Sequence, residues 1–324
     1  RHAKMQKVLF VLKVYRVDRW EVMDEKNETT IDKVIKRLAA LDRAYDYGIV
    51  IRHLNKKKDR RPLKLGQLWE VLKERPPSNL VFNDIDFTLS DYTNLEIVIK
   101  AQKTEQLVFT NFNMTNKEVE NRDLVRCFDS IANTPLKSLS IHKCDAIFTK
   151  TLLAPFAIGD DRLLNPRLTT NLTHISLLDI SSNDIETMKT FALVLIKSPK
   201  LKELTFKHLE TRSNSYEEHL KDIFWYALAR TEASLTRLHV TGMGDYFNRN
   251  IEFVADAING HPIESLQIEI PITDYSRHTR AVKFLAYRRD SPSSQATFWK
   301  MIKNATSLKE VYLKSFTPES VQRI

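Results

Sequence analysis

The segment Ile175–Ile185 reads ISLLDISSNDI and decides the fold expected for this chain. Apolar residues occupy its first, fourth and sixth positions, and an asparagine occupies the ninth. These residues are Ile175, Leu178, Ile180 and Asn183. The alternation predicts a short strand with one buried face, and the asparagine can satisfy backbone groups where the chain leaves the strand. An amphipathic helix is expected over Glu186–Lys197, and one strand plus one helix per unit is a solenoid repeat.

The same frame recurs along the rest of the chain. Its other copies start at Pro77, Thr104, Leu136, Leu201, Leu235, Ile263 and Leu308. The spacing between starts varies, and the longer intervals contain the loop-like insertions Gly159–Thr170 and Tyr287–Thr297. Insertions in a solenoid emerge from one edge, so we expect these two loops to be available for contacts with a partner.

Two stretches carry a resemblance to a known superfamily: LDISSNDI at Leu178–Ile185 and LKSLSIHKC at Leu136–Cys144. They resemble leucine-rich repeats, most closely the ribonuclease-inhibitor-like and cysteine-containing types. The resemblance covers residues 77–324 and extends to Asp46 in a weaker form. It implies an α/β leucine-rich repeat solenoid, a curved horseshoe with a parallel sheet on the concave side and helices on the convex side. The alternative is an ordinary α/β domain whose strands alternate by chance.

The N-terminal region reads as a cap for this solenoid. Val8–Val17 is expected to form a strand, and Thr30 can cap a helix over Ile31–Ala44. A terminal repeat needs a cap, because its outer apolar face would otherwise meet water. We therefore expect an N-terminal α/β cap, a strand and a helix, over residues 1–45 and a solenoid of about eight or nine irregular repeats over 46–324. A separate small N-terminal domain is the competing interpretation.

The positive charge of the chain is concentrated at its N-terminal end. The net charge is +9, and residues 1–76 hold 20 Lys and Arg against 11 Asp and Glu, whereas residues 77–324 hold 30 of each. Much of the excess lies in one predicted loop, which contains Lys56, Lys57, Lys58, Arg60, Arg61 and Lys64. Such a cluster is expected to be exposed. The sequence leaves open a solvated loop, a nuclear localisation signal, and a contact with nucleic acid or an acidic partner.

A search for catalytic chemistry is mostly negative. The chain contains no phosphate-binding glycine motif, no nucleophile elbow and no zinc-type Cys or His spacing, and it has 6 glycines in all. Its two cysteines exclude a disulfide-stapled domain, and Cys144 occupies an inward position of its repeat, where we expect a packed thiol. No apolar run is long enough to span a membrane. We expect a non-enzymatic protein without cofactor or metal, located in the cytoplasm or the nucleus.

The repeat frame also predicts which side chains face the concave side of the sheet. Positions one, four and six face the core, so positions two, three, five, seven and eight are expected on the concave side. On this frame the central repeats collect His142, Lys143, Asp179, Lys207, His208, Arg237 and His239. We expect these residues to form a mildly basic, pH-responsive patch suited to an acidic or phosphorylated protein. An ordinary polar surface without a partner is the alternative.

These observations favour a protein–protein interaction scaffold or adaptor that binds its partner with the concave face and the insertion loops. An RNA-associated leucine-rich repeat protein that uses the basic segment Lys56–Lys64 is the alternative. An enzyme or enzyme activator, such as a GTPase-activating solenoid, is a third hypothesis, but no residue stands out as a catalytic arginine. The functional step follows from the resemblance, because a fold does not fix a function.

Overall fold

We describe the chain from a computed structural model. The structure describes residues 8–14, 35, 38, 47–53, 65–113, 121–157, 170–180, 185–208, 215–241, 251–269 and 306–314. Within these ranges the chain alternates strands with helices and forms two compact units. We describe each unit by itself.

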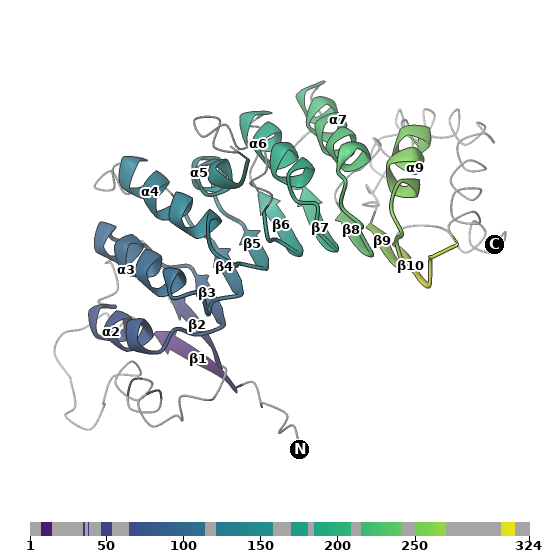
Figure 1. The fold of residues 1–324 in the computed structure, drawn as a ribbon. Coiled ribbons are helices and arrows are strands. Elements are labelled where there is room, and N and C mark those ends of the chain that lie inside the picture. Colours follow the sequence, from purple (N-terminus) through teal and green to yellow (C-terminus); the bar gives the residue numbers. More distant parts are fainter. Residues whose placement is uncertain are drawn as a thin grey trace, which may run out of the picture. The chain divides into compact units, whose positions relative to one another are not determined.

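Within the described residues the first unit contains five strands and four helices, which are labelled in Figure 1. Its elements are β1 (Val8–Val14), β2 (Tyr47–His53), α2 (Gly66–Glu74), β3 (Asn79–Asn83), α3 (Leu89–Lys100), β4 (Gln106–Thr110), α4 (Asn121–Ala132), β5 (Ser138–His142) and α5 (Ala146–Ala157). Every neighbouring pair of these strands is parallel, and the strands follow one another in chain order. The four helices lie on the same side of the strands.

The second unit repeats this plan. Its elements are β6 (His174–Ile180), α6 (Ile185–Ile196), β7 (Glu203–His208), α7 (Ser215–Arg230), β8 (Arg237–Thr241), α9 (Ile251–Asn259), β9 (Ser265–Glu269) and β10 (Glu310–Lys314). Strands β6 to β10 are again parallel and in chain order. Parallel neighbours joined by crossing helices are the arrangement that the strand–helix repeat predicts.

The strand register confirms the repeat frame over most of the chain. In the first unit Leu80 aligns with Leu107, which aligns with Leu139, and all three occupy position four. Phe82, Phe109 and Ile141 align in the same way at position six, and each of these six side chains is at most 1% exposed. The same positions align across β7, β8 and β9. The predicted α/β leucine-rich repeat fold is therefore confirmed.

The segment from which the frame was read is the exception, and its predicted register is wrong. Ile175 pairs with Leu204 at position four, and Leu177 pairs with Phe206 at position six. The repeat therefore starts at Leu172, three residues earlier than predicted, and Asn183 does not hold position nine. Ile175 and Leu177 are 3% and 1% exposed, whereas Leu178 is half-buried. Leu177 and Leu178 are adjacent, so the apolar pattern of the repeat fits a start at Leu172 as well as a start at Ile175.

The corrected frame explains a backbone feature shared by four repeats. Asp84, Asn111, Lys143 and Asp179 all occupy position eight, and all have positive φ angles, between 50° and 59°. At this position the chain leaves the strand in a left-handed conformation. Aspartate and asparagine tolerate that conformation better than other non-glycine residues. Lys143 is thus the residue least suited to it.

Aromatic side chains fill the core behind the strands. In the first unit Phe109 contacts Phe82, Phe112 and Phe148, with ring centroids 5.0 to 5.7 Å apart. In the second unit Phe206 stacks against Phe224 at 4.4 Å and against Phe191 at 5.8 Å. Rings at these separations interact favourably beyond the area that they bury.

One aromatic residue of α7 lies outside the core. Phe224, Trp225 and Leu228 are buried, whereas Tyr226 is 47% exposed. Its ring instead lies under the guanidinium of Arg230, 4.3 Å from the ring centroid.

Both cysteines are buried, free thiols. The Sγ atom of Cys127 donates to the Tyr92 carbonyl at 3.2 Å, and that of Cys144 donates to the His142 carbonyl at 3.3 Å. Burial raises the pKa of each thiol to about 12. A thiol that stays protonated is neither a good nucleophile nor a good metal ligand, and the packed position expected for Cys144 is observed.

The N-terminal strand continues the sheet. Strand β1 pairs in parallel with β2, and Val8 aligns with Tyr47. Residues 35 and 38 are helical, while the rest of the predicted helix over Ile31–Ala44 lies outside the described residues. The boundary between a cap and a solenoid at residue 45, and the number of repeats, stay predictions.

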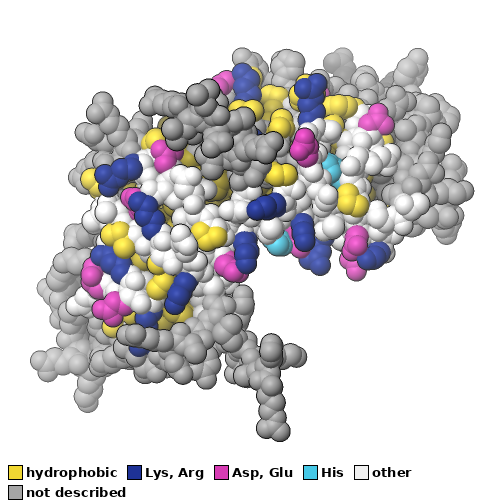
Figure 2. All heavy atoms as spheres, viewed as in Figure 1, with side chains coloured by type: hydrophobic (Ala, Val, Ile, Leu, Met, Phe, Trp, Pro, Cys, Tyr) yellow, Lys and Arg dark blue, Asp and Glu magenta, His cyan; other side chains and the backbone are white. Residues whose placement is uncertain are grey.

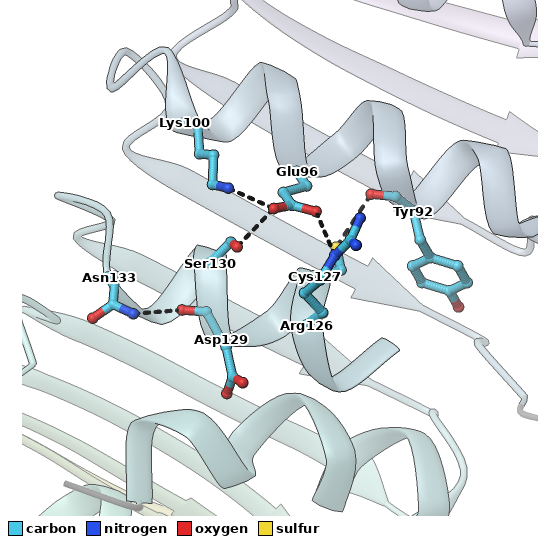
Figure 3. A network of polar contacts seen from close by, with 8 residues as sticks. All are labelled: Tyr92, Glu96, Lys100, Arg126, Cys127, Asp129, Ser130 and Asn133. Atoms are coloured by element: carbon cyan, nitrogen blue, oxygen red, sulfur yellow. Dashed lines mark hydrogen bonds and ion pairs between the residues drawn. The ribbon is translucent and has the colours of Figure 1, made fainter. Parts of the chain in front are cut away.

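A buried carboxylate connects α3 with α4 (Figure 3). Glu96 is 8% exposed and accepts hydrogen bonds from Lys100 Nζ at 2.5 Å and Ser130 Oγ at 2.8 Å, with Arg126 Nε 3.9 Å away. Burial alone would raise the pKa of Glu96. The hydrogen bonds from Lys100 and Ser130 and the neighbouring positive charges outweigh that effect, so the pKa lies below its ordinary value.

This network predicts a pH-dependent stability. Replacing Glu96 by glutamine should lower the free energy of unfolding at neutral pH by about 1 kcal/mol, because the charge-assisted contacts are lost. A carboxyl with a lowered pKa stabilises the fold above its unfolded-state pKa, and that contribution is lost as the pH falls through the folded-state pKa. The difference between wild type and Glu96→Gln, measured by urea unfolding, should therefore shrink toward zero under acidic conditions.

The matched control is Glu70→Gln. Glu70 pairs with Lys73 at 2.7 Å on the exposed surface of α2, so its loss should change the free energy of unfolding by only about 0.2–0.5 kcal/mol. A deficit of Glu96→Gln that stayed constant from neutral to acidic pH would contradict the role assigned to its charge.

Candidate binding surface

The sheet of each unit has one face turned away from its helices, which we call the open face. Positions three, five and seven of each repeat point to it, because positions four and six point into the core. In the second unit Ser176, Thr205 and His239 align at position five of β6, β7 and β8, and all three are half-buried. The described parts of both units thus present a regular array of side chains on this face.

Position three of the second unit forms a charged row across three strands. Glu203 lies between His174 and Arg237, which align with it from β6 and β8. Its Oε1 atom is 2.9 Å from Arg237 Nη1 and 3.1 Å from His174 Nε2. Cross-strand pairs of opposite charge of this kind hold side chains in register.

A second pair lies at the exit of β6. Asp179, in its left-handed conformation, places Oδ1 3.0 Å from Lys207 Nζ. The Asp179 side chain is only 15% exposed, whereas that of Lys207 is 47% exposed. The largely buried Asp179 carboxylate therefore compensates the charge of the more exposed Lys207.

The seven predicted residues divide between the two units. His142 and Lys143 end β5 in the first unit, and the other five belong to β6, β7 and β8 of the second. Lys143 is exposed and His142 half-buried. His208 ends β7, and its side chain lies outside the part of the chain that the structure describes.

The charge expected for this patch differs from what the structure shows in the second unit. The prediction opposed the cations with Asp179 alone, but Arg237 is paired with Glu203 and Lys207 with Asp179. Figure 2 shows positive, negative and histidine side chains interspersed over the surface in view. The prediction included Arg237 at position three but not Glu203, which aligns with it, and the register error in β6 hid His174 at the same position.

Lys143 allows a test of the position-eight geometry. Replacing Lys143 by asparagine should raise the free energy of unfolding by about 0.5–1 kcal/mol, because asparagine adopts the left-handed conformation at lower cost. Urea unfolding measures the change. The control is Lys103→Asn, at an exposed position without a positive φ, which should not be stabilised. Equal effects of the two substitutions would contradict the assignment.

The other predicted contact segments are not among the described residues. The basic segment Lys56–Lys64 and nearly all of the two insertions, Gly159–Thr170 and Tyr287–Thr297, lie outside the described residues. Within the described ranges no group of three or more His, Cys, Asp or Glu side chains is placed to hold a metal ion. No helix in those ranges is long and apolar enough to cross a membrane.

Comparisons with known proteins add little to this geometry. No protein-family model matches the chain, and no curated protein matches its sequence. Among solved structures the chain is similar to the crystal structure of a TLR13–ssRNA13 complex, with a TM-score of 0.32 and 13% sequence identity. That alignment covers 87% of this chain and 35% of the other, so this chain spans about a third of its length. The fold assignment rests on the strand register, not on this similarity.

Proposed function

We propose that this chain is a non-enzymatic scaffold or adaptor that binds a protein partner on the open face of its sheet. One observation carries the proposal: side chains on the open face of the second unit contact one another across neighbouring strands. Glu203 pairs with Arg237 and lies 3.1 Å from His174 Nε2, and Lys207 pairs with Asp179. A surface ordered before binding loses little side-chain entropy when a partner arrives.

The charge of this surface favours a protein over nucleic acid. Binding to a phosphate backbone relies on lysines and arginines whose charge is available to the phosphates. Here Lys207 and Arg237 are each compensated by a carboxylate. A surface that mixes both charges at fixed positions suits a partner with complementary mixed charge. RNA binding through Lys56–Lys64 is the alternative function, and the nuclease treatment in the test below distinguishes it from protein binding.

The test compares two variants of the full chain in affinity purification from native extract, with and without nuclease. Thr205→Arg places a bulky charge in the middle of the open face, whereas Leu193→Arg alters a 47% exposed position on α6. We expect a protein partner to co-purify with the wild type after nuclease treatment. The same partner should co-purify with Leu193→Arg but not with Thr205→Arg. The proposal would be contradicted if nuclease treatment removed every co-purified partner. It would also be contradicted if Thr205→Arg retained the same partners as the wild type.

The seven residues His142, Lys143, Asp179, Lys207, His208, Arg237 and His239 remain our proposal for the partner contacts, and we propose that an acidic or phosphorylated part of a mixed-charge partner contacts their cations. Charge reversal at Lys143 and Lys207 should then weaken the affinity for the purified partner. The ribonuclease-inhibitor-like or cysteine-containing repeat type is likewise a proposal. It is supported by the full helices that follow the strands and by the buried Cys144 at position nine.

A further inference from the structure

Strand β10 lies at the end of the sheet of the second unit (Figure 1). It pairs in parallel with β9 on one side, and no strand among the described residues pairs with its other side. The ladder fixes the direction of its backbone groups, because Glu310 N donates to the Glu264 carbonyl at 2.9 Å. These groups alternate in direction along a strand, so residues 311 and 313 turn their N–H and C=O groups to the other edge. Unpaired groups in such a row are a template for another strand.

The packing around β10 is also incomplete. Val311 occupies position four and aligns with Leu266, and the preceding strands carry Leu238 and Leu204 at this position. Each of the three leucines is 1% exposed, whereas Val311 is 39% exposed. A residue that belongs to the core by its repeat position is therefore partly in water beside an open edge. A further strand on this edge would cover it and bury apolar surface.

The order of residues in β10 makes this edge complementary to a second copy of itself. The strand reads Glu-Val-Tyr-Leu-Lys, with an acid at one end and a base at the other. Two such strands in antiparallel orientation, centred on Tyr312, place Glu310 opposite Lys314 of the second copy at both ends. They also place Val311 opposite Leu313. Opposite charges and apolar residues in directly opposed positions each stabilise an antiparallel pair.

The backbone allows only some registers, and one of them opposes the charges. Residues that exchange hydrogen bonds across an antiparallel pair must both turn their backbone groups to the shared edge. Centring the pair on residue 312 brings residue 311 opposite residue 313, and both meet this condition. Centring it on residue 311 or 313 also meets the condition but moves Glu310 away from Lys314. Charge therefore selects the register centred on Tyr312.

We propose that β10 pairs antiparallel with β10 of a second copy of this chain, about a twofold axis at Tyr312 and perpendicular to the sheet. Such a contact uses the same edge of both copies. Directly opposed residues share a face of the sheet, so the second copy covers Val311 on the core side. The open faces of the two second units then continue one another. The inference is independent of the proposed function, because it uses a strand edge and not the open face.

The experiment measures the association of the full chain by sedimentation velocity over a range of protein concentrations. We expect the wild type to convert from monomer to dimer as the concentration rises. Glu310→Lys should raise the dissociation constant of the dimer about tenfold, because both Glu–Lys pairs become Lys–Lys pairs. Lys314→Glu should act in the same way. The variant that combines both substitutions restores opposite charges and should dimerise as the wild type does.

The control is Glu70→Lys on the exposed surface of α2, which makes the same change of net charge as Glu310→Lys. It should leave the dissociation constant unchanged, so any effect of Glu310→Lys beyond it belongs to the edge of β10. The combined variant also separates a lost contact from a damaged fold, because damage at either position would not be repaired by the second substitution.

Three results would overturn the inference. The first is a wild type that stays monomeric at every concentration, as expected if β10 pairs with a strand of another protein. The second is a dimer that Glu310→Lys leaves intact, and the third is a dimer that the combined variant does not restore. None of them affects the proposed function, whose test depends on Thr205→Arg, and loss of a partner from Thr205→Arg leaves the dimer in place.

Discussion

Replacing Phe109 by alanine should destabilise the first unit by about 3–5 kcal/mol, the range measured for deleting a buried aromatic ring. Phe109 is 0% exposed and packs against Phe82, Phe112 and Phe148 with ring centroids within 5.7 Å. These rings come from three successive repeats, so alanine leaves a cavity that no single neighbour can fill. The loss should appear in the opening free energy of amides in β3, β4 and β5, measured by hydrogen exchange.

The control for this prediction is Ile147→Ala on α5. Ile147 is 60% exposed, so its truncation removes little buried surface and should change the same amides by less than about 1 kcal/mol. If Phe109→Ala and Ile147→Ala had equal effects, position six would not be the centre of the core, and the repeat frame would be wrong.

Replacing His261 by alanine should cost the second unit about 1–3 kcal/mol, because a buried carbonyl oxygen loses the N–H donor that the ring supplies. His261 is 8% exposed and precedes β9. Its Nδ1 atom lies 2.8 Å from the Ala233 carbonyl oxygen and its Nε2 atom 2.9 Å from that of Leu228. The ring thus connects the turn before β9 to the end of α7 and to the segment that leads into β8.

His261→Asn should be less damaging than His261→Ala, since an amide can replace one of the two contacts. The measurement is the hydrogen exchange of amides in β8 and β9. The control is His174→Ala, at a side chain that is 45% exposed on the open face and whose removal should cost less than about 1 kcal/mol. A cost for His261→Ala as small as that for His174→Ala would show that the two carbonyls find other partners.

Much of the fold could be predicted because strands with one buried face leave a clear pattern. Leu80, Leu107 and Leu139 are each followed two residues later by another buried apolar side chain, as a strand with one buried face requires. Where Leu177 and Leu178 are adjacent, the pattern no longer distinguishes the faces. The residue type at position eight could have decided the register of β6. Asp179 corresponds there to Asp84 and Asn111, and all three adopt a positive φ angle.

The candidate surface was less predictable, for a physical reason. Sequence position tells which face a side chain is on but not which neighbour compensates its charge. That depends on the register between strands far apart in the chain, as for Glu203 and Arg237, and on backbone geometry, as for Asp179 and Lys207. The role of His261 was not predicted either, since its two contacts are backbone carbonyls that no motif encodes.

The most direct test of the central claim is site-specific photo-crosslinking in nuclease-treated extract. A photoreactive side chain at Thr205 reports on the open face of the second unit, and one at Leu193 reports on the helical side. If the open face is the protein-binding surface, Thr205 should crosslink to a discrete protein partner and Leu193 should not. Equal crosslinking from both positions, or crosslinks at Thr205 that disappear when RNA is removed, would contradict the account.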